Sequence, residues 1–157
     1  NLLIPPRNQY GTNPFHAFIS HFFDKGEKER IRKAYETLEE LEITHMAHNL
    51  TSELSGGQSK LVDIGRALMG EPELLLLDEP VAGVAGPLAE KIFNNLRTIV
   101  SETSISIFVI EHNMDFILRR GVDRIIVMDQ GKVLMEGTPD EVKDSKEVIE
   151  AYLGGAG

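Results

Sequence analysis

Leu74-Leu75-Leu76-Leu77-Asp78-Glu79-Pro80 is the stretch that decides the fold. Four consecutive leucines predict a strand buried on both faces, the kind found inside a parallel sheet. Two carboxylates follow, and the ligand sites of open α/β sheets gather at the carboxyl ends of strands. Asp78 offers the hard oxygen that Mg²⁺ prefers, and Glu79 can polarise a water for attack on a phosphoryl group. The alternative is a solvated acidic turn that merely ends the strand.

The chain after this stretch alternates between helical and strand patterns, which predicts an α/β fold with a parallel sheet. Pro stands in the first turn of the next predicted helix, and Gly121 ends a shorter one. The predicted elements are a Gly-rich loop over 81–86, a helix over 87–100, a strand over 105–110, a helix over 113–120, a hairpin of 124–128 with 132–136, and a helical region from Pro139.

The chain before this stretch has no strand pattern. We predict loop and short turns through Asp24, then an amphipathic helix from Glu27 whose apolar face carries Ile31, Tyr35, Leu38 and Leu41. A polar connector leads to a second helix over 58–69. Residues 1–70 are therefore predicted to form a helical subdomain, and residues 71–157 the carboxy-terminal part of an α/β core.

Leu54-Ser55-Gly56-Gly57-Gln58 lies where the connector becomes the second helix. The N–H groups at a helix start and the helix dipole favour an anion, and two glycines let the backbone approach a phosphate closely. A serine N-cap after a flexible turn explains the same residues without a ligand. The local pattern by itself leaves both interpretations open.

Histidine and phenylalanine give weaker signals. His112 follows Glu111 at the end of the next strand, where it could donate a hydrogen bond to a terminal phosphate or be purely structural. His45 and His48 lack the accompanying ligands of a zinc site, so ordinary solvated histidines are expected. The phenylalanines predict buried packing, with a contact surface for a membrane partner as the alternative; they are Phe15, Phe18, Phe22 and Phe23.

The composition excludes several classes of protein. The 157 residues carry a net charge of −9, so no basic surface is available for nucleic acid. Cysteine is absent, which excludes disulfides and cysteine-based zinc sites and fits a reducing cytoplasm. Apolar runs such as Leu74–Leu77 are far too short to cross a bilayer, and we expect no signal peptide.

Taken together, the motifs resemble those of the ABC-type ATPases that power membrane transport. Leu54–Gln58 resembles the ABC signature, Leu74–Pro80 the Walker B strand with its catalytic glutamate, and His112 the switch histidine. The order and the separations fit as well. The resemblance covers essentially the whole chain and implies a RecA-like P-loop NTPase core with an all-helical ABC subdomain.

The subfamily is indicated by shorter stretches. Pro80–Val84 and Glu111-His112 look like those of branched-chain amino-acid import ATPases, as do Leu88–Ile92 and Val148–Gly154. Urea-import and lipopolysaccharide-export ATPases share part of this pattern and remain alternatives. ABC ATPases of repair or translation usually depart from this signature.

Two departures from the family pattern stand out. No G-x-x-x-x-G-K-[ST] phosphate loop (Walker A) occurs, nor does the glutamine loop that couples to the permease, and the chain does not begin with Met. We therefore expect an amino-terminally incomplete sequence. Ala85 stands where many members carry Asp or Asn, and it cannot form the hydrogen bonds of either side chain.

The resemblance also implies a mechanism. Two ATPase subunits, identical or different, close head to tail around two ATP molecules, and Ser55 and Gly57 bind the γ-phosphate of the partner's nucleotide. Asp78 places Mg²⁺ through water, Glu79 activates the attacking water, and His112 holds the γ-phosphate. The implied partners are transmembrane permease subunits and, indirectly, a substrate-binding protein. The implied location is peripheral, on the cytoplasmic face of the cell membrane.

The rival hypothesis is an inactive or regulatory fragment, because the signature and the base occur here without a phosphate loop. We expect the chain alone to bind ATP poorly and not to hydrolyse it. We also expect an uncovered sheet face and edge, and with them low solubility.

Overall fold

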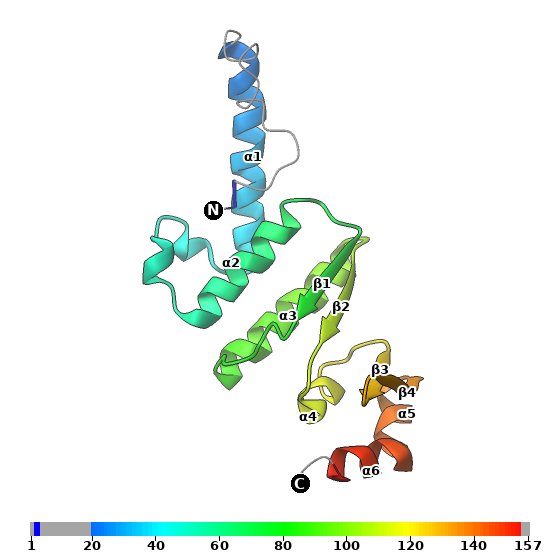
Figure 1. Ribbon diagram of the computed structural model, residues 1–157. Coiled ribbons are helices and arrows are strands. Elements are labelled where there is room, and N and C mark those ends of the chain that lie inside the picture. Colours follow the sequence, from blue (N-terminus) through cyan, green and yellow to red (C-terminus); the bar gives the residue numbers. More distant parts are fainter. Residues whose placement is uncertain (1, 4–19, 155–157) are drawn as a thin grey trace. The chain divides into compact units, whose positions relative to one another are not determined.

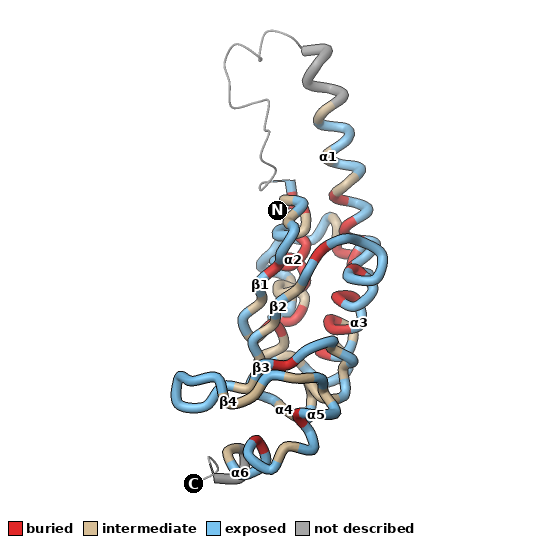
Figure 2. The backbone as a smooth tube through the Cα atoms, turned by 90° about the vertical axis from the view of Figure 1, so that its right-hand side faces the viewer, coloured by how far each residue is buried: buried red, intermediate tan, exposed pale blue. Residues whose placement is uncertain are grey.

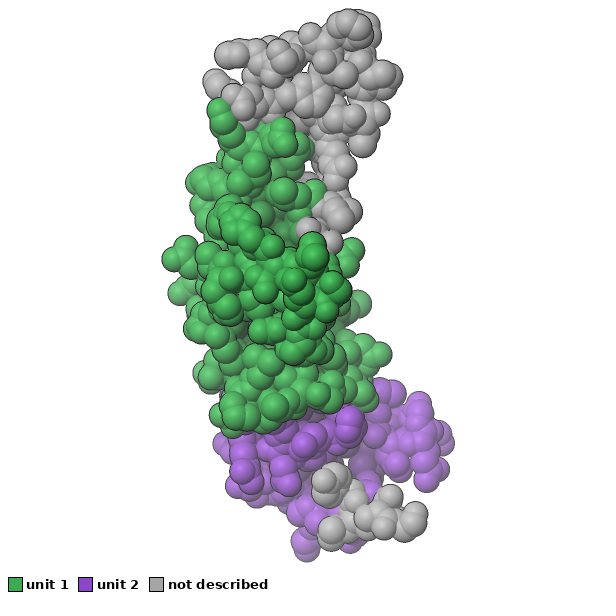
Figure 3. Space-filling view, turned by 90° about the vertical axis from the view of Figure 1, so that its left-hand side faces the viewer, with its two compact units in different colours: residues 1–110 green, residues 111–157 purple. Residues whose placement is uncertain are grey.

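The computed structural model describes residues 2–3 and 20–154, and the side chains among them except those of 20–25 and 152–154. The phenylalanines at 15, 18, 22 and 23 therefore lie outside the described side chains. Figure 1 shows the helices and strands in chain order. The chain divides into two compact units, residues 1–110 and 111–157, coloured separately in Figure 3. Each unit has its own apolar cluster.

Helix α1, Ser20–Glu40, is the first helix among the described residues of the first unit. Our prediction of loop and short helical turns through about Asp24 is contradicted at residues 20–24, which already belong to this helix. The predicted apolar face is also corrected: Leu38 and Leu41 are buried, but Ile31 and Tyr35 are 38% and 42% exposed. The described part of α1 before Ala34 has no buried residue, so the core covers only its last turns.

A left-handed residue ends α1. Glu42 has φ +55°, and the N–H of Ile43 donates to the Leu38 carbonyl at 2.8 Å, which is the Schellman arrangement of a helix C-terminus. Two short 3-10 turns follow, η3 (Thr44–Met46) and η4 (Thr51–Glu53), and then helix α2 (Gly56–Leu68). Helix α2 buries Leu61, Val62 and Ile64 against the first unit's core.

Strands β1 (Leu74–Asp78) and β2 (Ser106–Ile110) pair in parallel, joined through helix α3 (Gly86–Glu102). The predicted α/β class with a parallel sheet is confirmed. Helix α3 buries Ile92, Leu96 and Ile99, which lie in the same cluster as Leu75. The buried stretches of α2 and α3 appear red in Figure 2.

The prediction that the leucine strand is buried on both faces is wrong for this chain. Leu75 is 5% exposed, whereas Leu74 and Leu76 are 54% and 68% exposed, and Phe108 and Ile110 of β2 are about half exposed. Side chains alternate between the faces of a strand, so only one face of this two-stranded sheet is covered in the first unit. The expected uncovered face is therefore present.

The second unit is built around a hairpin. Strands β3 (Ile125–Asp129) and β4 (Lys132–Gly137) pair antiparallel through Gln130 and Gly131, both at positive φ, as the two-residue turns of twisted hairpins require. Helices α4 (Met114–Leu118), α5 (Pro139–Asp144) and α6 (Lys146–Gly154) complete the unit. Its small core consists of Ile125, Val142 and Val148. The predicted hairpin and terminal helices are confirmed.

Candidate functional site

The signature-like segment forms a reciprocal cap at the start of α2. The Ser55 hydroxyl accepts from the N–H of Gln58 at 3.3 Å, and the Gln58 side chain accepts from the N–H of Ser55 at 2.9 Å. This capping box fixes the first turn within four residues. Leu54, just before it, packs partly buried against the core of the first unit. The segment is thereby rigid at both ends while Ser55 stays exposed.

The two glycines of this segment differ in their surroundings. A Cβ at Gly56 would meet nothing within 4 Å, and the residue is exposed. A Cβ at Gly57 would lie 2.4 Å from Leu88 Cδ2 and 3.1 Å from Val84 Cγ1, and Gly57 is buried. Gly57 therefore lets α2 pack closely on the loop and helix after the acidic turn. Gly56 is the glycine that leaves open space in front of the helix start.

The acidic turn places its two carboxylates in different backbone contexts. Asp78 is the last residue of β1 and is exposed, whereas Glu79 has left the strand and lies at φ +44°. Non-glycine residues seldom adopt this left-handed conformation, which costs roughly 1–2 kcal/mol. Pro80 follows and is buried. Because the backbone conformations of Asp78 and Glu79 differ, their two carboxylates leave the chain in different directions.

The backbone of Glu79 is held from two other elements and from its own loop. Its N–H donates to the Ile110 carbonyl at the end of β2 at 2.9 Å, and its carbonyl accepts from the N–H of Ala82 at 3.1 Å. Lys60 of α2 also donates its Nζ to this carbonyl at 2.7 Å, in a partly buried position. Lys60 could not be predicted from the sequence, because a lone lysine on a helix gives no signal beyond that of a solvated cation.

The loop after the acidic turn ends at Ala85, which is the N-cap residue of α3. Its backbone has the extended N-cap conformation, φ −61° and ψ 142°, but its side chain makes no capping hydrogen bond. Asp and Asn are among the best N-cap residues. We predicted that Ala85 cannot form the hydrogen bonds of Asp or Asn. The local consequence is that helix α3 starts without a side-chain cap.

Asp78 could supply one ligand of the predicted magnesium site. Mg²⁺ keeps several waters and is bound through one or two carboxylates together with substrate phosphates, so one exposed carboxylate at a strand end fits this chemistry. Across the described residues, no group of three or more His, Cys, Asp and Glu side chains could hold a metal by itself. This chain would therefore supply one magnesium-directed oxygen rather than a complete protein cage.

His112 and Glu111 follow β2 and belong to the second unit, where His112 is exposed. The role predicted for His112 consequently rests on its sequence context. His45 and His48 are exposed residues in and after η3, in the first unit.

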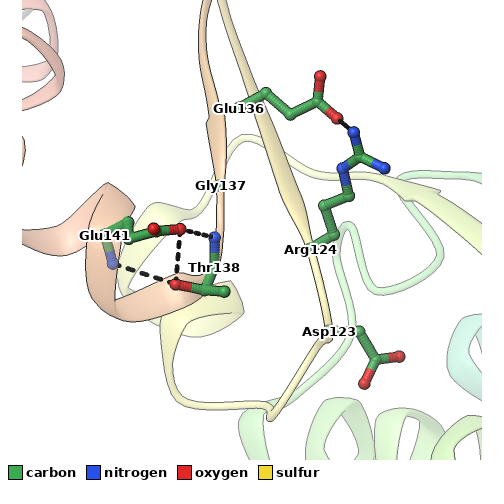
Figure 4. A pocket seen from close by; sticks show the side chains of 6 residues that line it. All are labelled: Asp123, Arg124, Glu136, Gly137, Thr138 and Glu141. Carbon is green, nitrogen blue, oxygen red and sulfur yellow. Dashed lines mark hydrogen bonds and ion pairs between the residues drawn. The ribbon is translucent and has the colours of Figure 1, made fainter.

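The second unit carries an open pocket that contains none of the predicted site residues (Figure 4). Arg124 and Glu136 form an ion pair on its wall. Thr138 and Glu141 form a second capping box, in which the Thr138 N–H donates to Glu141 at 2.8 Å and the Glu141 N–H to the Thr138 hydroxyl at 3.4 Å. The backbone hydrogen bond from Thr138, and then its hydroxyl, lowers the pKa of Glu141. These groups stabilise the start of α5.

Two family models match the chain. The ABC transporter model matches residues 5–82, and the model of the branched-chain amino acid ATP-binding cassette transporter matches residues 132–157. The chain belongs to the ATP-binding cassette family of ABC transporters and is close to the branched-chain amino acid group within it. In the described part of the chain, no helix is both long and apolar enough to cross a membrane.

Curated relatives agree with this family. A probable branched-chain amino acid transport ATP-binding protein of Methanocaldococcus jannaschii is 39% identical over 98% of this chain and 60% of its own length. A high-affinity branched-chain amino acid transport ATP-binding protein of Pseudomonas aeruginosa is 33% identical over 99% of this chain and 61% of its own length. The chain thus spans about three fifths of the length of the curated relatives it matches.

Solved structures confirm the fold class. An ATP-binding cassette of an ABC transporter in its ADP conformation matches with a TM-score of 0.71 and 40% identity, over 79% of this chain and 50% of that one. A nucleotide-free cassette matches with a TM-score of 0.71 and 36% identity, over 89% of this chain and 56% of that one. The predicted P-loop NTPase core with an ABC subdomain is therefore confirmed as the fold class.

Proposed function

We propose that this chain is the signature-bearing and Walker B-bearing part of an ATP-hydrolysing subunit of an ABC transporter that imports branched-chain amino acids. The observation that carries the proposal is the acidic turn. Glu79 follows a parallel strand in a strained conformation fixed by hydrogen bonds from two other elements. Strain of this kind persists only where the surroundings enforce it, and it clusters at functional sites.

Each residue has a role that follows from its chemistry. Glu79 accepts a proton from the attacking water, and Asp78 orients the water shell of Mg²⁺, which neutralises phosphate charge when bound. His112 donates a hydrogen bond to the γ-phosphate. The segment Leu54–Gln58 faces the ATP of a second subunit, where Ser55 and the backbone of Gly57 bind the γ-phosphate and the open space at Gly56 lets it approach the helix start. Gln58 contributes by holding Ser55 in place.

The same proposal includes the partners. A second ATPase subunit, identical or different, is needed because the signature and the acidic turn act on different nucleotides. Transmembrane permease subunits bind the cassette, which is peripheral on the cytoplasmic face of the membrane, and a substrate-binding protein acts through them. ATP and Mg²⁺ are the ligands. The 157 residues alone bind ATP weakly and do not hydrolyse it, since they contain no phosphate loop.

The test measures ATP hydrolysis by the whole natural polypeptide that contains this chain. Glu79→Gln removes the base while keeping the shape of the side chain, so we expect kcat to fall by about 10²–10⁴-fold. Glu73→Gln is the matched control, because Glu73 is an exposed carboxylate just before β1, and it should leave kcat unchanged. Equal activity of the two variants would refute the role of Glu79.

A transport measurement tests the substrate class. Deleting the gene should abolish uptake of labelled leucine while urea uptake continues, and a plasmid copy should restore leucine uptake. Loss of urea uptake instead would transfer the assignment to the urea-import alternative.

A further inference from the structure

Glu79 needs more support than an ordinary residue after a strand. At φ +44° its Cβ crowds the following carbonyl oxygen, and the ring of Pro80 further restricts the residue before it to extended conformations. Sequence neighbours therefore oppose the observed backbone. The conformation must be enforced by contacts from elsewhere in the fold.

The Glu79 carbonyl is where this support converges. Pro80 has no N–H, so the peptide group between Glu79 and Pro80 can be fixed by hydrogen bonds only through the Glu79 carbonyl oxygen. The Ala82 N–H reaches that oxygen at 3.1 Å from the same loop, and Lys60 Nζ reaches it at 2.7 Å from α2. The lysine bond is the shorter of the two, and a charged donor makes it the stronger one.

Lys60 also connects two functional segments of one chain. It lies five residues after Ser55 on α2, the helix whose first turn is the capped signature segment. Its Nζ lies on the carbonyl of Glu79, and Gly57 packs on Val84 and Leu88 just beyond. Helix α2 is therefore joined to the acidic turn by one charged hydrogen bond and by one close backbone approach.

We propose that Lys60 is a positioning residue that holds the strained Glu79 backbone and thereby couples the signature helix to the acidic turn within one subunit. Lys60 acts through the backbone of Glu79, which its Nζ contacts. The proposal rests on the proposed function for its effect on turnover, but the holding of the backbone is independent of it. This bond is a side-chain link from α2 to the acidic turn.

The first test separates turnover from binding in the whole natural polypeptide. Lys60→Met keeps the apolar stem and removes the ammonium. Since small misplacements of a catalytic group are costly, we expect kcat to fall about 10- to 100-fold. KM for ATP should stay within about twofold, because the proposed role of the lysine is to hold the Glu79 backbone and not to bind the nucleotide. Lys60→Arg restores a donor and should recover part of kcat.

The control is Lys33→Met, which makes the same change at a partly buried lysine of α1 that pairs with Glu71. It should leave kcat and KM unchanged. If Lys60→Met and Lys33→Met lower the melting temperature equally and neither changes kcat, Lys60 is merely structural and the proposal is overturned.

The second test does not depend on activity. Amide hydrogen exchange of Ala82, whose N–H donates to the Glu79 carbonyl, should be faster in Lys60→Met than in the wild type and in Lys33→Met. Unchanged exchange at Ala82 would overturn the holding role. A different outcome is also informative: the wild type hydrolyses no ATP, while exchange at Ala82 is still faster in Lys60→Met. That result would support the holding role and refute the proposed function.

Discussion

Helices α2 and α3 start in opposite ways. Helix α2 begins at Ser55 with a capping box made within four residues, so its geometry is set by the local sequence. Helix α3 begins at Ala85 with no side-chain cap, after a turn in which Glu79 is held in a left-handed conformation by Ile110 and Lys60. The first start is fixed by its own capping box, whereas the second has only Pro87 as a local signal and follows a turn that distant parts of the chain hold.

This difference agrees with the chemistry proposed for each segment. A phosphate site at a helix start needs only exposed N–H groups in a rigid first turn, which a capping box of four residues can supply. The open space at Gly56 leaves room for the phosphate. A base must be aimed relative to other groups, which requires fixation from several elements. The strain at Glu79 is the structural sign of that requirement.

The largest effect is expected from Glu79→Gly, which separates the backbone strain from the carboxylate. Glycine adopts positive φ readily, so the free energy of unfolding should be unchanged or rise by up to about 1 kcal/mol. Without the base, kcat of the whole polypeptide should fall by at least about 10²-fold. Thermal or denaturant unfolding and an ATPase assay measure the two effects.

The control for this change is Gln130→Gly, at a residue with φ +46° in the hairpin turn of the second unit. It relieves the same kind of strain and should leave ATP hydrolysis unchanged. A clear loss of stability in Glu79→Gly alone would mean that the side chain, and not only the backbone, is held by the fold.

A smaller effect is expected from exchanging the glycines of the signature segment. An added Cβ at Gly57 would force the Leu88 side chain to move, so the free energy of unfolding of Gly57→Ala should be lower than that of Gly56→Ala, by up to about 1 kcal/mol. Gly56→Ala is the matched control, because it gains the same helix propensity without a clash. Denaturant unfolding of both variants measures the difference.

The two variants should also differ in function. Gly56→Ala places a methyl group in the open space before the helix, so we expect it to slow ATP turnover while the protein stays fully stable. Equal stability of the two variants would show that α2 does not need a close approach to Leu88 and Val84.

The smallest effect is expected from giving α3 the cap that α2 already has. Ala85→Asp should raise the free energy of unfolding by about 1 kcal/mol, because the backbone at 85 already has the N-cap conformation. Ala85→Asn tests whether the gain comes from the hydrogen bond or from the charge at the helix start. Absence of a gain in both variants would contradict the assignment of residue 85 as an uncapped N-cap.

Much of the fold and of the candidate site could be predicted from local patterns. Ser55 and Gln58 stand at capping-box spacing, and Gln130-Gly131 stands between two apolar runs, so both features follow from near neighbours. The same holds for the parallel sheet, since a strand, a helix and a second strand follow one another. Ile31 and Tyr35 were misjudged because helical periodicity defines a face without saying where its partner ends.

The sequence by itself determined the family and the order of the elements and supplied the residues proposed to bear the chemistry, because ordered motifs and short-range patterns do not depend on packing. Only the tertiary structure decided that Glu79 is strained, that Lys60 holds its carbonyl, and that Gly57 serves packing while Gly56 stays open. Lys60 and Glu79 are 19 residues apart. Contacts across such distances arise from the packing of whole elements, and no local pattern records them.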